Sequence, residues 1–250
     1  MRILEVKGVS KAFGGLAAVS GVSFHIDAGE IVGLIGPNGA GKTTMFNLVS
    51  GVYRPTHGRI IFKDQDITHL KTHAIARKGL VRSFQSNLLF SSMTVFANVE
   101  LACFQCSAKG ALGVLPTVSL RRRESDVTEE VMEVLRFVGL EKMAGWPVRQ
   151  LPHGPQRLVG IAIALATKPE LLLLDEPVCG MNAEETEEVM GLIRSLRQRG
   201  IVSLVVEHNM RAVMSTCDRL IVLDHGTKIA EGLPEEIKQN RDVIKAYLGE

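Results

Sequence analysis

Residues 36–44 constrain the fold of this chain more than any other segment. They read Gly36-Pro37-Asn38-Gly39-Ala40-Gly41-Lys42-Thr43-Thr44, which fits the pattern G-x-x-x-x-G-K-[ST]. The apolar residues 31–35 before them predict a buried strand, and residues 44–49 after them predict a helix. A glycine-rich turn between strand and helix would need only the glycines. The full pattern in this context predicts a loop that binds phosphate.

The chemistry of such a loop explains the residue types in it. Glycines let backbone N–H groups turn inward toward phosphate oxygens, because they carry no Cβ that would clash. The positive end of the helix that follows adds to this field. Lys42 supplies a point charge for the β- and γ-phosphates of a nucleotide, and the Thr43 hydroxyl can ligate Mg²⁺. We therefore expect every residue of the loop to contribute to nucleotide binding.

Length, charge and cysteine content narrow the class of protein. A chain of 250 residues suits one large α/β domain, or one domain with a small insertion. Its net charge of +2 does not favour nucleic acid as the main partner. An acid interrupts the apolar N-terminus and no long apolar run occurs, so neither a signal peptide nor a membrane span is expected. Cys103 and Cys106 lack a second pair or a nearby histidine, so we expect a reduced, cytoplasmic chain without a zinc site.

Strand and turn patterns predict two kinds of β structure. Within residues 3–26, short alternating apolar patterns with turns at Gly14-Gly15 and at Gly21 predict antiparallel strands, and residues 58–62 predict another strand of that sheet. Later apolar runs predict strands at residues 80–84, 171–174, 201–206 and 220–223. Helices are expected between them, including one over residues 182–199 that Gly200 ends. This alternation predicts an α/β fold with a mainly parallel sheet.

A mainly helical block interrupts that rhythm. Apolar residues recur with a helical period over residues 129–140, and Asp126 with Glu129 predicts a capping box at the start of this helix. Residues 107–123 show no periodicity, end in three arginines and predict a long loop. We expect an α/β core of residues 1–92 and 150–250, with an antiparallel β subdomain, and an inserted helical subdomain of residues 93–149.

Two acids end one of the predicted strands. Asp175 and Glu176 follow four leucines, and the carboxyl end of a strand beside a phosphate loop is where ligands bind. There Asp175 can hold the Mg²⁺ shell, and Glu176 can polarise the water that attacks a γ-phosphate. An acidic helix cap would give the same residues, but the phosphate loop favours catalysis. His208, just past another predicted strand, is placed to reach the γ-phosphate, although a lone histidine is more often a surface or core residue.

The order of these motifs resembles that of the ABC transporter ATPases over essentially the whole chain. An aromatic residue, the phosphate loop, a glutamine, a signature segment, the Asp-Glu pair and a histidine follow one another. The resemblance implies a P-loop NTPase core that binds and hydrolyses ATP with Mg²⁺. It also implies that Phe13 stacks on adenine, and that Gln85 contacts Mg²⁺ and relays to a membrane subunit. It places Asn182 at an ATPase dimer interface and makes His208 the switch histidine. Without the resemblance, Phe13 and Gln85 would be ordinary strand residues.

The segment Leu151-Pro152-His153-Gly154-Pro155 departs from that family's pattern. The family usually has Leu-Ser-Gly-Gly-Gln here, a segment that binds the γ-phosphate held by the other ATPase subunit. Pro152 has neither a hydroxyl nor an N–H, and Pro155 lacks an N–H but suits the first turn of a helix. We expect Gly154 and the helix dipole to keep facing a phosphate while the serine contact is lost.

Within the family, the resemblance is to ATPases of bacterial branched-chain amino acid importers. It rests on residues 82–90, 107–123, 176–182, 207–210 and 246–250. The implied partners are a second, different ATPase subunit, two transmembrane permease subunits and, indirectly, a periplasmic binding protein, but no nucleic acid. The implied location is peripheral, on the cytoplasmic face of the bacterial inner membrane. A heterodimer is favoured because a homodimer would carry the altered signature in both sites.

Other functions share parts of this pattern. Members of the same subgroup import urea or amides, and no ATPase residue lines the translocation path, so the sequence does not specify the cargo. The ATPase of a lipid or lipopolysaccharide exporter has the same cassette. A soluble ABC ATPase acting on DNA or ribosomes usually has two cassettes or a long coiled insertion. A GTPase would need an Asn-Lys-x-Asp motif, which the sequence lacks, and a small-molecule kinase would leave Glu176 and His208 unexplained.

Overall fold

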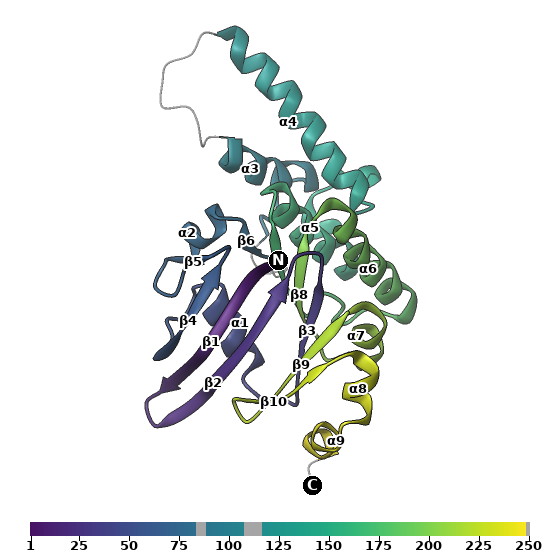
Figure 1. The fold of residues 1–250 in the computed structure, drawn as a ribbon. Coiled ribbons are helices and arrows are strands. Elements are labelled where there is room, and N and C mark those ends of the chain that lie inside the picture. The colour runs from purple at the N-terminus through teal and green to yellow at the C-terminus, as the bar shows by residue number, and fades with distance from the viewer. Residues whose placement is uncertain (84–88, 108–116, 249–250) are drawn as a thin grey trace. The chain divides into compact units, whose positions relative to one another are not determined.

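The computed structural model describes residues 1–83, 89–107 and 117–248 (Figure 1). The chain divides into a unit of residues 1–82 with 170–250, here called the nucleotide unit, and a unit of residues 83–169, the helical unit. The predicted division at residues 93 and 149 stays a prediction. The helical unit of the structure begins before residue 93 and ends after residue 149. It extends past residue 149 because its last helix packs against its other two helices.

A six-stranded sheet forms the centre of the nucleotide unit. Its strand order is β10-β9-β3-β8-β7-β6, and all neighbours are parallel except β9 and β10. Every residue of β3 and β8 is buried, which explains why these strands are almost entirely apolar, with Ser203 of β8 as the exception. The bounds are β3 (Ile31–Ile35), β6 (Leu80–Arg82), β7 (Leu171–Asp175), β8 (Val202–Val206), β9 (Arg219–Asp224) and β10 (Thr227–Gly232).

Parallel pairing brings the functional ends of these strands together. Leu34 of β3 and Asp175 of β7 both pair with Val206 of β8. The carboxyl ends of three strands therefore meet at one edge of the sheet, and the loops that follow them start side by side. The predicted strands at residues 171–174, 201–206 and 220–223 are confirmed, and β10 was not predicted.

A second, antiparallel sheet has the order β2-β1-β4-β5. Its strands are β1 (Arg2–Phe13), β2 (Leu16–Asp27), β4 (His57–Phe62) and β5 (Gln65–Asp66). The predicted turn at Gly14-Gly15 is confirmed, but the one predicted at Gly21 is wrong. Gly21 lies inside β2 with φ 61°, where the register between Val9↔Val22 and Lys11↔Val19 shifts by one residue. It forms a bulge, for which glycine suits the positive φ.

Helix α1 (Lys42–Val49) lies between the two sheets of the nucleotide unit (Figure 1). Its Met45, Phe46 and Val49 join one buried cluster with apolar residues of both sheets. The other helices of this unit are α2 (Thr72–Arg77), α6 (Ala183–Leu196), α7 (Met210–Thr216), α8 (Pro234–Gln239) and α9 (Arg241–Leu248). Burial of α1 between two sheets fixes the position of the loop that precedes it.

Helix α6 begins with a capping box that was not predicted from the sequence. The Asn182 side chain accepts from the Glu185 N–H, and the Glu185 side chain accepts from the Asn182 N–H. After α6 a 3₁₀ turn (Arg197–Arg199) leads to Gly200, whose φ of 73° ends the helical path. The helix predicted over residues 182–199 is confirmed.

In its described residues, the helical unit contains α3 (Val95–Ser107), α4 (Thr117–Phe137), α5 (His153–Ala166) and two short 3₁₀ turns, Glu141–Met143 and Val148–Gln150. The loop predicted over residues 107–123 is wrong for residues 117–123, which are the first turns of α4, and residues 108–116 lie outside the described part. The predicted capping box at Asp126 and Glu129 falls inside that helix. These first turns carry few apolar residues, so no helical stripe marks them in the sequence. None of the described helices is both long and apolar enough to cross a membrane.

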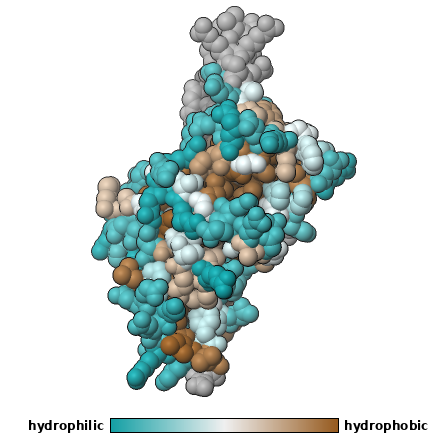
Figure 2. Space-filling view, turned by 90° about the vertical axis from the view of Figure 1, so that its right-hand side faces the viewer, coloured by the Kyte–Doolittle hydropathy of each residue, from teal (hydrophilic) through white to brown (hydrophobic). Residues whose placement is uncertain are grey.

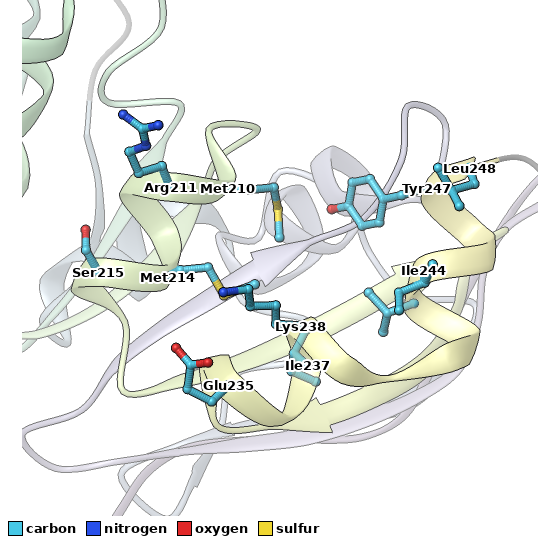
Figure 3. Close-up of a pocket in the computed structure, with 11 residues that line it drawn as sticks. Met210, Arg211, Met214, Ser215, Glu235, Ile237, Lys238, Ile244, Tyr247 and Leu248 are labelled. Carbon is cyan, nitrogen blue, oxygen red and sulfur yellow. The ribbon is translucent and has the colours of Figure 1, made fainter.

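A groove lies among the last helices of the nucleotide unit. It has a volume of about 680 Å³ and is lined mainly by apolar side chains of α7, α8 and α9 (Figure 3). Met210 of α7 and Tyr247 of α9 point toward one another across it. Ile244 and Leu248 remain 42% and 69% exposed, and apolar surface also appears at the lower end of Figure 2. The C-terminal helix thus presents apolar side chains both to the groove and to solvent.

Candidate functional site

The phosphate loop joins β3 to α1, as predicted. Gly36 and Gly41 have φ of 149° and 98°, and a Cβ on them would lie 2.1 Å from the Leu223 carbonyl oxygen and 2.6 Å from the Ala18 carbonyl oxygen. Both positions therefore require glycine for space as well as for conformation. A Cβ on Gly39 would meet nothing within 4 Å, so this part of the loop leaves its open side to a ligand.

Lys42 is held over the loop by backbone carbonyls. Its Nζ donates to the Gly36 oxygen at 2.7 Å and to the Pro37 oxygen at 2.8 Å. Burial lowers the pKa of Lys42, and the nearby Glu176 carboxylate opposes that shift. The ammonium group is thus kept at the mouth of the loop, with two donors engaged by oxygens that a phosphate could replace.

Glu176 and His208 face each other from neighbouring loops. Glu176 follows β7 with a φ of 47°, and its N–H donates to the Val206 oxygen at 2.8 Å. The His208 Nε2 lies 3.0 Å from the Glu176 Oε1, within hydrogen-bond distance. Both side chains are partly exposed, 44% for His208 and 40% for Glu176, so solvent and a ligand can reach them.

The buried Glu207 fixes these two loops, and sequence reasoning gave it no role. Its Oε1 accepts from the Val178 N–H at 2.9 Å, and its Oε2 accepts from the His208 N–H at 2.9 Å. The residue is only 3% exposed. Its position directly after a buried strand, at the same edge as Asp175, was a sequence feature that could have identified it.

A cavity of about 770 Å³ brings most of the predicted site residues together. It is lined by Phe13, Leu16, Ala17, Ala18, Asn38, Gly39, Ala40, Gly41, Lys42, Thr43, Thr44, Glu176, His208, His225 and Gly226. This volume falls in the range of cofactor pockets. Gly36 and Pro37, the first two residues of the loop, do not line the cavity, and their carbonyls accept from Lys42. The predicted phosphate loop, aromatic residue, acid and histidine thus share one cavity of the nucleotide unit.

Phe13 presents an exposed aromatic face at this cavity. Its side chain is 43% exposed, and its ring meets that of Tyr53 edge-on at a centroid distance of 5.2 Å. The Lys11 Nζ lies 5.0 Å from the Phe13 centroid. The ring is therefore held by Tyr53 and Lys11 while 43% of the residue stays exposed at the cavity, where a planar base could stack on it.

The turn between β9 and β10 also lines the cavity, and it was not predicted. The Gly226 N–H donates to the Ala40 oxygen at 3.1 Å, and the Ser20 N–H donates to the Gly226 oxygen at 2.8 Å. A Cβ on Gly226 would lie 2.8 Å from the Ala18 oxygen. The His225-Gly226 pair between two apolar runs is a turn signal that sequence reasoning overlooked.

The C-terminal helix reaches the phosphate loop as well. Burial raises the pKa of the Tyr247 hydroxyl, and a hydrogen bond with the Gly36 backbone opposes this rise. Tyr247 belongs to α9, and it also lines the groove described above. The Tyr247 hydroxyl of α9 therefore lies close to the first residue of the loop.

Asp175 is held by Arg82 at the end of the neighbouring strand. The Arg82 Nη2 donates to the Asp175 Oδ2 at 2.6 Å, and the Asp175 side chain is 8% exposed. Asp175 is not among the residues that line the described cavity, although the next residue, Glu176, is. Gln85 lies outside the described residues.

Gly154 belongs to the helical unit. Helix α5 begins at His153 with Pro152 at its N-cap, and no side chain caps it. Pro155 stands in the first turn, as predicted. The Gln156 Nε2 donates to the Leu151 oxygen at 2.8 Å, which ties the helix start to the segment before it.

Comparisons with known proteins agree with this architecture. Residues 19–179 match the family model described as ABC transporter, and residues 227–250 match the model described as branched-chain amino acid ATP-binding cassette transporter. The chain therefore belongs to the ABC transporter family, as an ATP-hydrolysing cassette. The predicted resemblance to this family is confirmed.

Among its relatives are two bacterial proteins of full length. The chain is 44% identical to the high-affinity branched-chain amino acid transport ATP-binding protein LivG of Escherichia coli, over 99% of the chain and 98% of LivG. It is 42% identical, with the same coverage, to the corresponding protein BraF of Pseudomonas aeruginosa. The structure is also similar to the ADP conformation of an ATP-binding cassette of an ABC transporter. That comparison gives a TM-score of 0.86, 28% identity and full coverage of both chains.

Proposed function

We propose that this chain is the ATP-hydrolysing subunit that powers import of branched-chain amino acids through a membrane permease. The observation that carries the proposal is the single cavity that joins the phosphate loop, Phe13, Glu176 and His208. The similarity to LivG and BraF along the whole chain supports the choice of cargo. An importer of urea or amides, or a lipopolysaccharide exporter, is a less well supported alternative.

ATP would enter with its base at Phe13 and its phosphates at the loop. The exposed Phe13 face would stack on adenine, and the backbone N–H groups of residues 36–44 would surround the phosphates. Lys42 would exchange the Gly36 and Pro37 carbonyls for the β- and γ-phosphate oxygens. Charge-assisted hydrogen bonds are stronger than those to neutral carbonyls, which favours this exchange.

Thr43, Asp175 and Gln85 are the residues that would hold Mg²⁺. Hydroxyl, carboxylate and amide oxygens are the ligands this hard cation prefers, and it is typically bound by one or two carboxylates together with substrate phosphates. Thr43 is exposed at the cavity, and Asp175 ends the strand that leads directly to Glu176. These residues fit the cation, which would neutralise charge that develops on the phosphates.

Glu176 would activate the attacking water. Its carboxylate lies at the cavity, 3.0 Å from the His208 Nε2, so the histidine can orient it before ATP binds. A γ-phosphate in the cavity would compete with Glu176 for His208, and the Glu176 carboxylate would then accept a proton from water. Glu207 would hold the loops that carry Glu176 and His208 in place during this change, because it accepts hydrogen bonds from the backbone of each.

The partners would be a second ATPase subunit with a conventional signature, two permease subunits and, indirectly, a periplasmic binding protein. The chain would act peripherally on the cytoplasmic face of the inner membrane, where Gln85 and the helical unit would receive the permease. Pro152 and Pro155 weaken this chain's own signature, so a mixed ATPase pair is the expected arrangement.

Copurification followed by ATPase assays tests this proposal. Two permease subunits and a second ATPase should copurify with the tagged chain. ATP hydrolysis by the reconstituted complex should rise with a binding protein loaded with leucine, isoleucine or valine. A Lys42→Ala complex serves as the inactive control. Stimulation by urea or acetamide alone, or copurification with a lipopolysaccharide permease, would contradict the proposed cargo.

A further inference from the structure

Arg82 joins three parts of the nucleotide unit through one guanidinium group. Its Nη2 donates to the Asp175 Oδ2 at 2.6 Å, and its Nη1 donates to the Asn47 Oδ1 at 2.7 Å. Its Cζ lies 4.9 Å from the centroid of the Phe46 ring. The last residue of β6 therefore contacts the last residue of β7 and two residues of α1.

These contacts restrain the group far more than an exposed ion pair would. Arg82 is 26% exposed, Asp175 is 8% exposed and Phe46 is fully buried. A guanidinium is planar and carries its donors in a fixed fork, so two different acceptors set both its position and its orientation. The Phe46 ring adds a cation–π contact. By contrast, the pair of Arg2 and Glu5 is an exposed one in which Arg2 is 58% exposed.

Asn47 gives the arrangement its link to the phosphate loop. Thr43 and Asn47 are four residues apart on α1, so they lie on the same face of the helix, one turn from each other. Arg82 thus holds α1 one turn after the predicted Mg²⁺ ligand Thr43, and with its other nitrogen it holds the predicted ligand Asp175. Asp175 accepts from Arg82 through Oδ2, and within the described residues its Oδ1 has no hydrogen bond, so Oδ1 would be the oxygen that faces a cation.

We propose that Arg82 is a positioning residue for the Mg²⁺ site, which sets the rotation of the Asp175 carboxylate and its placement relative to the helix that carries Thr43. This inference rests on the proposed function, which assigns Asp175 and Thr43 to the cation. Groups that hydrogen-bond a metal ligand from behind orient it, and their loss typically costs about 10- to 100-fold in metal affinity.

The test measures how Mg²⁺ strengthens ATP binding. The full-length chain carries Glu176→Gln so that ATP is not consumed, and a fluorescent ATP analogue is titrated in EDTA and at rising Mg²⁺. The Mg²⁺ midpoint is the Mg²⁺ concentration that gives half of the increase in ATP affinity. Arg82→Gln should raise this midpoint about 10-fold. The affinity for the ATP analogue in EDTA should stay within about 2-fold of the parent. Arg82→Lys should fall between, because a point charge cannot hold both acceptors in one plane. Arg2→Gln, with the same change of charge, should match the parent.

Three outcomes would overturn the inference. One is an unchanged Mg²⁺ midpoint in Arg82→Gln, or in Arg82→Lys if the glutamine variant does not fold. Another is an equal loss of ATP affinity with and without Mg²⁺, which would show a purely structural role. The third involves Asp175→Asn: if this variant leaves the midpoint unchanged, the proposed metal site itself is wrong. A shift in Asp175→Asn without one in Arg82→Gln would leave the metal site standing and reject only the role of Arg82.

Discussion

The N-termini of α1 and α5 differ in what they offer a phosphate. Neither helix has a side-chain cap, so both leave backbone N–H groups for a ligand. The first three residues of α1, which are Lys42, Thr43 and Thr44, all carry an N–H, and they follow a glycine loop. The first three of α5 include Pro155, which has none, and Pro152 stands where a hydroxyl would help. The N-terminus of α1 therefore has all of its N–H donors for a phosphate, whereas that of α5 keeps the helix dipole but has fewer donors.

Because of this difference, the two ATP sites to which these helix ends would contribute need not be equally active. In the proposed ATPase pair, the loop before α1 would hold this chain's own ATP, while α5 would face the ATP of the partner. The donors missing from α5 would weaken only the partner's site. A charge-assisted hydrogen bond contributes about 1.5–3 kcal/mol, so losing one could make the sites unequal by an order of magnitude.

The largest expected effect is at the ATP site formed by the loop before α1. Glu176→Gln should lower ATP hydrolysis at this chain's site by about 10²–10⁴-fold, because it removes the positioned base. MgATP binding should persist, because Lys42 and the loop N–H groups remain. The reconstituted complex is assayed with this change, and then with the equivalent change in the partner. Equal losses would contradict the asymmetry, and full activity of this chain as a homodimer would reject the mixed pair.

The next effect concerns the base-binding end of the same cavity. Phe13→Ala should weaken ATP binding about 10- to 100-fold, because a base–aromatic stack contributes roughly 1–3 kcal/mol. The rate of hydrolysis at saturating ATP should change little. Phe104→Ala is a matched control, since Phe104 is 44% exposed and Phe13 is 43% exposed. An unchanged dissociation constant in a fluorescence titration would return Phe13 to the status of an ordinary strand residue.

A smaller effect is expected from repair of the weaker helix end. Pro152→Ser restores a hydroxyl at the N-cap of α5 and should raise turnover at the partner's site by up to about 10-fold. The assay uses a complex in which this chain also carries Glu176→Gln, so that the remaining hydrolysis belongs to the partner. Pro152→Ala, which adds no hydroxyl, is the control. If serine and alanine gave the same rate, the missing hydroxyl would not explain the asymmetry.

The smallest effect sharpens the contrast between capped and uncapped helices. Asn182→Ala removes the capping box of α6 and should lower the free energy of unfolding by about 1 kcal/mol. Pro152→Ala at the uncapped α5 should change it by much less. Urea denaturation of the isolated chain measures both. A larger loss at Pro152 than at Asn182 would contradict this expectation and show that Pro152 itself stabilises α5.

Local patterns were enough to predict most of the residues that meet at the candidate site. Short patterns of a few residues each predicted the loop, the strand that ends at Asp175, the acid after it and His208. Phe13 was predicted only from the resemblance to a family. The missed features depend on contacts between distant segments. Glu207 and Arg82 act through partners 29 and 93 residues away, and no short pattern displays such pairs. The first turns of α4 were missed because they carry no apolar stripe.

The backbone at Glu176 has a further consequence, for engineering. A φ of 47° is uncommon for a residue with a long side chain, and such conformations persist at a cost of about 1–3 kcal/mol where the surroundings enforce them. Here the surroundings are the Val206 carbonyl and the hydrogen bond from Val178 to Glu207. Glycine would relax this backbone but would also remove the base. A glycine substitution chosen here for thermostability would therefore be expected to abolish ATP hydrolysis at this chain's proposed site.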